Sequence, residues 1–247
     1  MRGLAPYYNL IRASAGVFDG FFLVGGGGPL RTDLSVNAFE VLSETEIANG
    51  GNQAPPYPRP QPDSDHFRKW EVAGASHLDH WVQQAVVPLQ IRDGVPQIPD
   101  NPQCTLPAFS RIPYHFVLNA AIDQMDRWVK DNIAPPMAPE ITLDATSLTG
   151  VARDSYGNAL GGIRLAQHDV ATAVNTGVNY PGSPCRFFGT YQPFDEATLE
   201  ALYGKHGAYV SRVSNDVTLD NLSRGYLLEE DAAVTVRDAA HSAVGKP

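Results

Sequence analysis

The sequence of 247 residues has little cysteine, few basic residues and no long apolar run. Its two cysteines, Cys104 and Cys185, are compatible with one disulfide or with two buried thiols, and their spacing does not decide between these. Lys and Arg number 18 against 27 Asp and Glu, so the net charge is -9. Because nucleic-acid binding needs clustered basic residues, we expect no nucleic-acid partner. No apolar stretch reaches the roughly 18 residues that cross a bilayer, so we expect no membrane span.

The remaining composition is that of a globular protein. Hydrophobic residues make up 43% of the chain and charged residues 18%, which is ordinary for a folded domain. The first 18 residues contain no continuous apolar segment, so they do not predict a signal peptide. No repeat and no low-complexity tract is present. The length suits one large domain or two small ones.

Three segments in the first third of the chain have the character of strands. Residues 17–26, VFDGFFLVGG, are short, apolar and bounded by glycine, as is typical of a strand that is buried on both faces. Residues 36–46 follow, and their apolar part stops at Leu42. Residues 67–74 alternate in character and predict a third strand. Between the last two segments, residues 49–65 form a proline-rich loop.

The second half of the sequence predicts helices and loops. Residues 86–107 are interrupted by prolines and predict an irregular stretch. Residues 113–132 predict a helix with one apolar face. The residues of that face are Val117, Ala121, Met125 and Trp128.

Further helical segments are predicted toward the C-terminus. One lies within residues 193–225, with Asp195 as its N-cap and Gly225 as its C-terminal stop. Residues 227–243 predict a last helix with acidic residues in its first turn, where the helix dipole favours them. Residues 150–180 are rich in turns, and we expect them to pack over a surface or a pocket.

Carboxylates and a histidine follow two of the predicted strands. Glu44 and Glu46 lie where the second strand ends, and His77 follows the third strand after a tight Ala-Gly-Ala-Ser turn. The carboxyl ends of parallel strands meet at one edge of a sheet, where reacting groups collect. A carboxylate that accepts a hydrogen bond from one imidazole nitrogen would leave the other free to take a proton. The alternative is that His77 is a capping or surface residue and that both acids are solvated.

A metal site at this turn is a second possibility. His77, Asp79 and His80 form a His-x-Asp-His pattern. This spacing differs from the His-Glu-x-x-His arrangement that puts two ligands on one helix face, and no cysteine pair lies nearby. The pattern therefore favours neither zinc nor another cofactor, and we predict none.

No nucleophile is evident in the sequence. The motif G-x-S-x-G is absent, and Ser14 has a glycine two residues later but no preceding strand. Ser43 and Ser76 adjoin the candidate acid and histidine too closely in sequence to face them across a site. Cys104 and Cys185 lie in loops without a strand-to-helix elbow.

Several long stretches of the chain resemble the alpha/beta hydrolase domain family, and the chain is similar to the C-terminal portion of that family. These stretches run in order along nearly the whole chain: VFDGFFLVGGGG, VLSETE, RPQPDSDHFRKWEVAGASH, IPYHFVLNAAIDQMDRWV, YGNALGGIRLAQHDVATAVNTGVN, CRFFGTYQPF, LYGKHGAYVSRV and GYLLEEDA. The resemblance implies an α/β fold with the last strands of a partial alpha/beta-hydrolase sheet. Residues 1–81 would supply these strands and the acid and histidine loops, and residues 82–247 would form a helical, lid-like region of the same domain.

The resemblance also implies roles for the candidate residues. His77 corresponds to the histidine of a Ser-His-Glu triad, and the acid lies in SETE, with Glu46 preferred and Glu44 as the second choice. In the family the serine elbow Gly-x-Ser-x-Ser-Gly runs into a helix with a Tyr-x-Asn-like element, which LAPYYNLI resembles. Matching that element places the expected serine just before Met1.

Two functions remain open from the sequence. The first is a serine hydrolase that acts on small carboxylic esters or related acyl compounds, with its serine supplied by a partner polypeptide or an upstream segment, or with a local serine recruited, for which Ser14 is the first choice. The second is a non-catalytic binding or assembly module. In either case we expect self-association or a partner chain that covers the edge of the incomplete sheet. Aromatic residues that could line a substrate pocket, or equally belong to the core, are Trp81, Tyr114, Phe116, Tyr180, Phe187 and Phe188.

Overall fold

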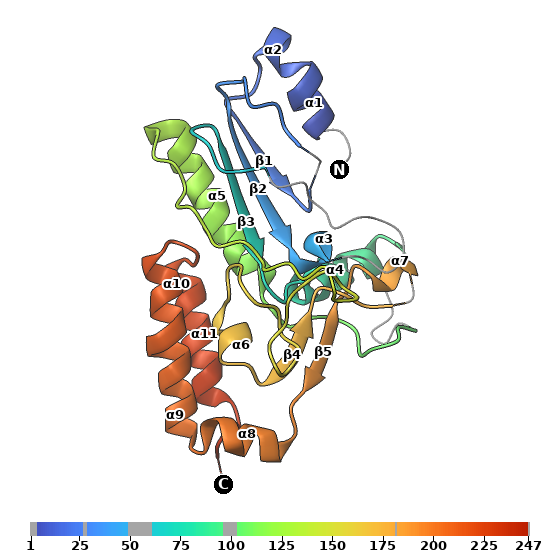
Figure 1. Cartoon of the computed structure of the whole chain (residues 1–247), viewed down its shortest axis with the longest axis vertical. Coiled ribbons are helices and arrows are strands. Elements are labelled where there is room, and N and C mark those ends of the chain that lie inside the picture. The colour runs from blue at the N-terminus through green and yellow to red at the C-terminus, as the bar shows by residue number, and fades with distance from the viewer. Residues whose placement is uncertain (1–3, 27–28, 49–60, 96–102, 181, 247) are drawn as a thin grey trace.

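The three apolar segments of the first third form a parallel sheet in a computed structural model of the chain (Figure 1). The structure describes residues 4–26, 29–48, 61–95, 103–180 and 182–246. The sheet order is β1-β2-β3, with bounds Gly20–Val24, Asn37–Ser43 and Phe67–Val72. In register, Val24 lies beside Val41, which lies beside Trp70. All three predicted strands are confirmed, although each is shorter than the segment that predicted it.

Helices cover both faces of this sheet because successive strand residues point to opposite sides. Phe21 and Leu23 pack in a cluster with Tyr8 of α1 (Leu4–Leu10), while Phe22 and Val24 turn toward the other face. That other face packs against α5 (Tyr114–Asp131). The predicted apolar face of α5 is confirmed, since its four residues are all buried.

The C-terminal region adds a small antiparallel pair and a group of helices (Figure 1). The pair consists of β4 (Ala173–Thr176) and β5 (Thr190–Pro193). The other described helices are α2 (Arg12–Ala15), α3 (Glu44–Ile47), α4 (His80–Arg92), α6 (Ala166–Asp169), α7 (Gly182–Cys185), α8 (Glu196–Tyr203), α9 (His206–Ser211), the π-helix η1 (Arg212–Thr218), α10 (Leu219–Ser223) and α11 (Glu229–His241). These elements agree with an α/β fold that contains part of an alpha/beta-hydrolase sheet. Within the described residues, no helix combines the length and the apolar character needed to cross a membrane.

The prediction that residues 86–107 are irregular was wrong for its first part. Helix α4 continues to Arg92 and contains Pro88. Its start is fixed by Asp79, whose Oδ1 accepts from the backbone N–H groups of Trp81 (2.8 Å) and Val82 (3.0 Å). A proline inside a helix removes one intrahelical hydrogen bond, so the sequence pattern predicts an interruption where α4 is in fact continuous. Residues 96–102 lie outside the described part.

The segment 193–225 forms two helical units. Asp195 caps the first through Thr198 N–H (2.8 Å), as predicted. Gly204, at φ +60°, then ends α8, and the chain restarts as the continuous run α9–η1–α10. Gly225 follows that run at φ +77°, as expected of a helix stop. The last helix lies within the predicted range.

Cys104 and Cys185 form a disulfide that connects the loop after α4 to α7. This decides between the two alternatives that their spacing left open. Nearby, Leu78 N–H donates to Phe187 O (2.9 Å), so the disulfide-linked segment also lies against the turn that follows β3.

The two long edges of the sheet differ. Beyond β3, Ile163 forms a parallel bridge with Val72, and its N–H donates to Glu71 O at 2.7 Å. Among the described residues, β1 pairs only with β2, so its outer edge has no strand partner there. An unpaired edge presents backbone N–H and C=O groups that can pair with another strand.

Candidate active site

The candidate acids and histidine meet at the carboxyl ends of β2 and β3. Strand β2 runs directly into α3, which contains both Glu44 and Glu46. The turn after β3 is tight, with Gly74 at φ +72°. The two segments are tied together, since Thr45 Oγ1 accepts from His77 N–H (3.0 Å) and donates to Gly177 O (2.6 Å).

Glu46 and His77 form a hydrogen-bonded pair. The distance from Glu46 Oε1 to His77 Nδ1 is 2.5 Å. The other carboxylate oxygen, Oε2, accepts from both the backbone N–H (2.8 Å) and the hydroxyl (2.7 Å) of Ser43. The Glu46 side chain is 9% exposed, whereas the His77 side chain is 33% exposed. Ser43 therefore fixes the Glu46 carboxylate, while one edge of the His77 imidazole remains accessible to solvent.

The carboxylate changes the proton affinity of the imidazole. The hydrogen bond that Glu46 accepts from His77 raises the pKa of His77 above its ordinary value of 6.5, and partial burial opposes this effect. The same bond favours the tautomer with the proton on Nδ1, because an ionised carboxylate only accepts. Neutral His77 then has an unprotonated Nε2, which is the arrangement of a general base.

The surroundings of His77 restrict its position. The His77 and Phe187 rings lie with centroids 5.0 Å apart. On another side lies Gly25, at φ +75°, directly after β1. A Cβ at Gly25 would come within 2.7 Å of His77 Cε1, so this position requires glycine for both conformation and space. Of the aromatic residues considered from the sequence, Phe187 is the one that contacts His77.

Glu44 lies near Glu46 in sequence but makes different contacts. Its side chain is fully buried and accepts from Arg153 Nη2 (2.7 Å) and from the backbone N–H of Gly74 (2.8 Å). This carboxylate thus connects α3 to the turn after β3 and to the C-terminal region. Its partners assign it a positioning role in the structure.

No serine of the described residues hydrogen-bonds to His77. Ser43 donates to Glu46, and Ser76 donates to Leu78 O (2.9 Å). Ser14 belongs to α2, which lies near the start of β1, at the opposite end of the sheet from α3 (Figure 1). Its hydroxyl donates to Ile11 O.

The three residues of the His-x-Asp-His pattern do not converge on one point. Asp79 caps α4 and accepts from Nδ1 of His115 (2.9 Å). His80 Nε2 contacts the guanidinium of Arg111. Across the part of the chain that is described, no group of three or more His, Cys, Asp or Glu side chains is placed to hold a metal ion.

Comparison with known families identifies the family of this chain. The family model described as alpha/beta hydrolase domain matches residues 2–237. The chain belongs to the alpha/beta hydrolase domain family. No curated protein and no solved structure matches the chain.

Sequence reasoning missed several features of this alpha/beta hydrolase domain. Ser43 supports Glu46 with two hydrogen bonds, and the pattern Ser-Glu-Thr-Glu, a helix start with an acid three residues after the serine, was the available signal. Gly25 was visible only as one of four consecutive glycines. The pair of Asp79 and His115 joins residues 36 positions apart and left no local signal.

The pKa of His77 tests the pair directly. We expect Glu46→Gln to lower the pKa of His77 toward its ordinary value, because a neutral amide stabilises the imidazolium less than a carboxylate does. NMR titration of the imidazole resonances measures this pKa.

The matched control is Glu44→Gln, which removes the neighbouring charge but keeps an amide oxygen that can accept from the Gly74 N–H and so hold the turn in place. We expect it to lower the free energy of unfolding by about 1–3 kcal/mol, since it weakens a buried charge-assisted hydrogen bond, and to leave the His77 pKa raised. A His77 pKa that is unchanged in Glu46→Gln, or that falls equally in both variants, would contradict the assignment of Glu46.

Proposed function

We propose that this chain carries the acid and histidine of a serine hydrolase that acts on carboxylic esters or related acyl compounds. The observation that supports this is the hydrogen bond between Glu46 and His77 at the carboxyl edge of the sheet. We assign Glu46 as the acid and Glu44 as its structural neighbour. In this proposal the domain has the two parts that the sequence predicts. Residues 1–81 supply the sheet and the acid and histidine loops, and residues 82–247 supply the helical region.

In the proposed reaction, Glu46 holds His77 with its Nδ1 proton directed at the carboxylate. Nε2 takes the proton of a serine hydroxyl as its oxygen attacks the ester carbonyl. The imidazolium then donates this proton to the leaving alcohol, and the acyl group remains on the serine. Water, activated by His77 in the same way, hydrolyses the acyl-enzyme and releases the acid.

The serine and an oxyanion hole are the parts that the described residues do not supply. We propose that a partner polypeptide or an upstream segment presents the serine to Nε2, as the resemblance to the family predicts. The exposure of the His77 side chain, 33%, supports this placement because it leaves an edge of the imidazole accessible. Backbone N–H groups of the same added segment would stabilise the developing oxyanion.

Ester turnover tests the role of His77. In protein that includes the segment or partner carrying the serine, we expect His77→Ala to reduce kcat/KM for a short-chain nitrophenyl ester by about 10²–10⁴-fold, the range for general acid–base groups. Glu46→Gln should reduce it less, because the imidazole remains. The exposed His241, changed to alanine, serves as the control and should leave turnover unchanged.

A fluorophosphonate probe locates the nucleophile in the same experiment. Because no described serine hydrogen-bonds to His77, we expect the chain alone to remain unlabelled. Labelling of a serine in the chain alone that disappears in His77→Ala would make it a stand-alone hydrolase and would contradict the external nucleophile. Equal turnover by the wild type and His77→Ala would contradict the hydrolase proposal itself.

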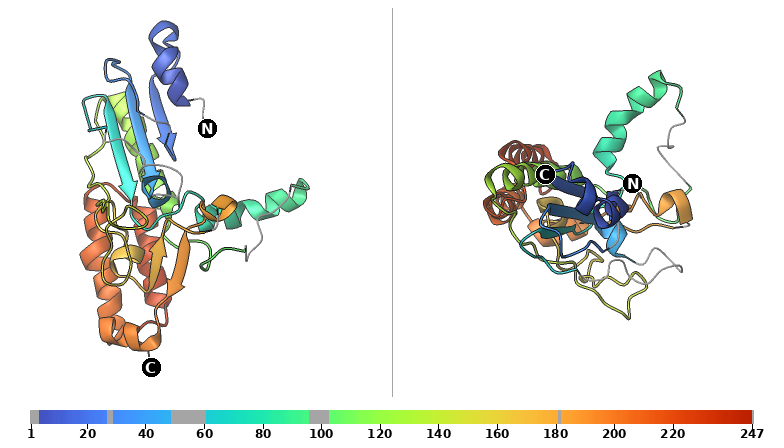
Figure 2. Two further views of the ribbon diagram at one scale, coloured as in Figure 1. Left: turned by 45° about the vertical axis from the view of Figure 1, so that its right-hand side comes forward. Right: turned by 90° about the horizontal axis from the view of Figure 1, so that it is seen from above.

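The second candidate function is a non-catalytic binding or assembly module. It is favoured by α4, which projects away from the rest of the molecule (Figure 2). The helix exposes 47% of Val82, 50% of Leu89 and 61% of Ile91. Together with the unpaired edge of β1, this leaves apolar side chains and backbone groups available to a partner.

Self-association tests this second candidate. We expect light scattering coupled to gel filtration to show a mass above that of the 26.7 kDa monomer that increases with concentration. The double variant Leu89→Lys and Ile91→Lys should shift the distribution toward monomer, and Asp126→Asn on the exposed surface of α5 is the control. A single monomeric mass at all concentrations would count against assembly through these surfaces.

A further inference from the structure

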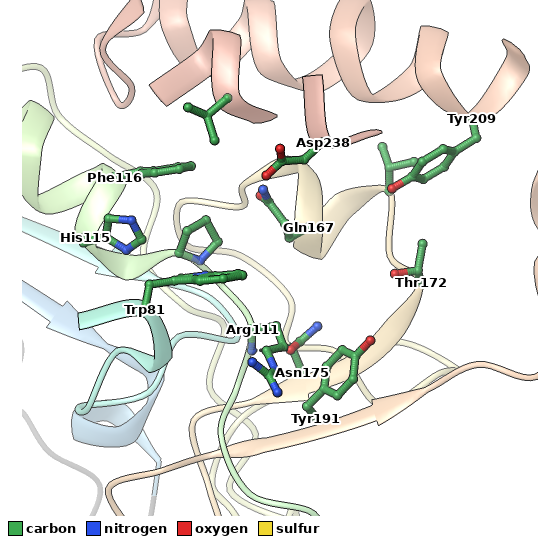
Figure 3. Close-up of a pocket in the computed structure, with 13 residues that line it drawn as sticks. Trp81, Arg111, His115, Phe116, Gln167, Thr172, Asn175, Tyr191, Tyr209 and Asp238 are labelled. Atoms are coloured by element: carbon green, nitrogen blue, oxygen red, sulfur yellow. Dashed lines mark hydrogen bonds between the residues drawn. The ribbon is translucent and has the colours of Figure 1, made fainter. Parts of the chain in front are cut away.

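One feature that the proposed reaction does not use is a cavity of about 610 Å³. It lies where α4 and α5 meet the strands β4 and β5 and the C-terminal helices (Figure 3). Its size is within the range of small-molecule sites. Neither His77 nor Glu46 is among the residues that line it. Part of the lining comes from residues 167–175, so the turn-rich segment does pack over a pocket as expected.

One wall of the cavity is polar and carries a positive charge. Figure 3 shows Arg111, Asn175 and Tyr191 together on this wall. The Arg111 guanidinium lies over the Tyr191 ring at 5.5 Å, and the Arg111 backbone N–H donates to Asn175 Oδ1 at 2.8 Å. The side chain also contacts His80 Nε2. The guanidinium is thereby held between the Tyr191 and His80 rings, and the backbone of Arg111 is held by the Asn175 amide.

Arg111 has no acidic partner in the described part of the chain. None of the ion pairs there includes it, and its neighbours are an imidazole and a phenol. Partial burial lowers the pKa of Arg111, as expected when no carboxylate compensates for lost water. A guanidinium has five N–H donors, and a carboxylate can accept two of them in parallel. A bound anion would stabilise the partly buried charge of Arg111 in the way that a protein carboxylate would.

The adjacent wall is apolar and contains an exposed aromatic ring. This wall is formed by Trp81, Pro113 and Phe116. Trp81 is 48% exposed. His115 lies beside them, with its Nδ1 occupied by Asp79, so that only Nε2 is available to a ligand. An apolar group placed here would remove part of the Trp81 ring from water.

The charges of the lining restrict the kind of anion. Arg111 is the one Arg or Lys among the lining residues, and Asp238 lies on the side away from it, next to Gln167 (Figure 3). A dianionic phosphate would face one guanidinium and one carboxylate. A monoanion whose charged group is at one end and whose body is apolar avoids the unfavourable contact with Asp238.

We propose that this cavity binds a small organic carboxylate with an aromatic or branched apolar body. The carboxylate is held by Arg111 with the Asn175 side chain and the Tyr191 hydroxyl nearby, and the body lies against Trp81, Pro113 and Phe116. The site is independent of the proposed hydrolase reaction, because it needs no serine and is read out by binding.

Isothermal titration with a matched pair of probes tests the proposal. We expect 2-naphthoate to bind the wild type at least about tenfold more tightly than the neutral 2-naphthalenemethanol, because only the acid forms charge-assisted bonds to Arg111. Arg111→Gln should weaken naphthoate by about 10- to 100-fold and leave the alcohol unchanged. Arg111→Lys should recover part of the lost naphthoate affinity, since lysine keeps the positive charge but cannot donate two parallel hydrogen bonds from a planar group.

Two exposed positions give variants whose folding is not at risk. Trp81→Ala should weaken the acid and the alcohol by the same factor, because it removes contact with the body. Asp238→Asn should tighten naphthoate and permit binding of 2-naphthyl phosphate, because it removes the opposing charge. Glu46→Gln is the control for the hydrolase site and should not affect either probe.

Three results would overturn the proposal. They are the absence of naphthoate binding to the wild type, equal affinity for acid and alcohol, and unchanged naphthoate affinity in folded Arg111→Gln. If Arg111→Gln does not fold, equal responses of acid and alcohol to Asp238→Asn would overturn it instead. None of these results depends on ester turnover.

Discussion

A buried carboxylate, that of Glu44, is the contact on which the geometry of the candidate site depends. It accepts from the Gly74 N–H in the turn after β3 and from Arg153 in the C-terminal region. A fully buried charge of this kind is stable only while its partners are present. The contact therefore fixes α3 relative to the turn that carries His77.

Glu46 can pair with His77 because this frame is already set. With α3 held by Glu44, Glu46 two residues later faces the imidazole, and Ser43 donates to its second carboxylate oxygen. Glu44 and Glu46 are separated by one residue but have different roles. Glu44 is buried and positions α3, whereas Glu46 contacts His77 at the edge of the site. Because both residues are glutamates, the difference between their roles comes from the side chains around each carboxylate.

In the region beyond β3, one carboxylate likewise has two structural roles. Asp79 uses one oxygen to start α4 and the other to hold His115 at the wall of the cavity. The turn from His77 to His80 therefore contributes to two separate places, the candidate active site and the cavity with Arg111. Both contain a histidine whose Nδ1 is held by a carboxylate, which leaves Nε2 available in each.

Local patterns predicted the strands, the apolar face of α5 and the approach of an acid to His77, because strand ends in a parallel sheet share an edge. They did not predict α4, since Pro88 concealed a helix whose start depends on Asp79. They did not choose between Glu44 and Glu46, because that choice depends on Arg153, which lies 109 residues away from Glu44. The cavity is assembled from six separate parts of the sequence and has no local signature.

The central claim is that Glu46 and His77 interact directly, and a double-mutant cycle of Glu46→Gln and His77→Ala measures this interaction. Because the pKa of His77 is raised in the folded protein, its contribution to stability is present at pH below the unfolded value and is lost as pH rises through the folded value. Urea unfolding near pH 5.5 should give a coupling free energy of about 0.5–3 kcal/mol, the range for contacting residues. The coupling should decrease near pH 9. Additive effects of the two substitutions at both pH values would contradict the claim.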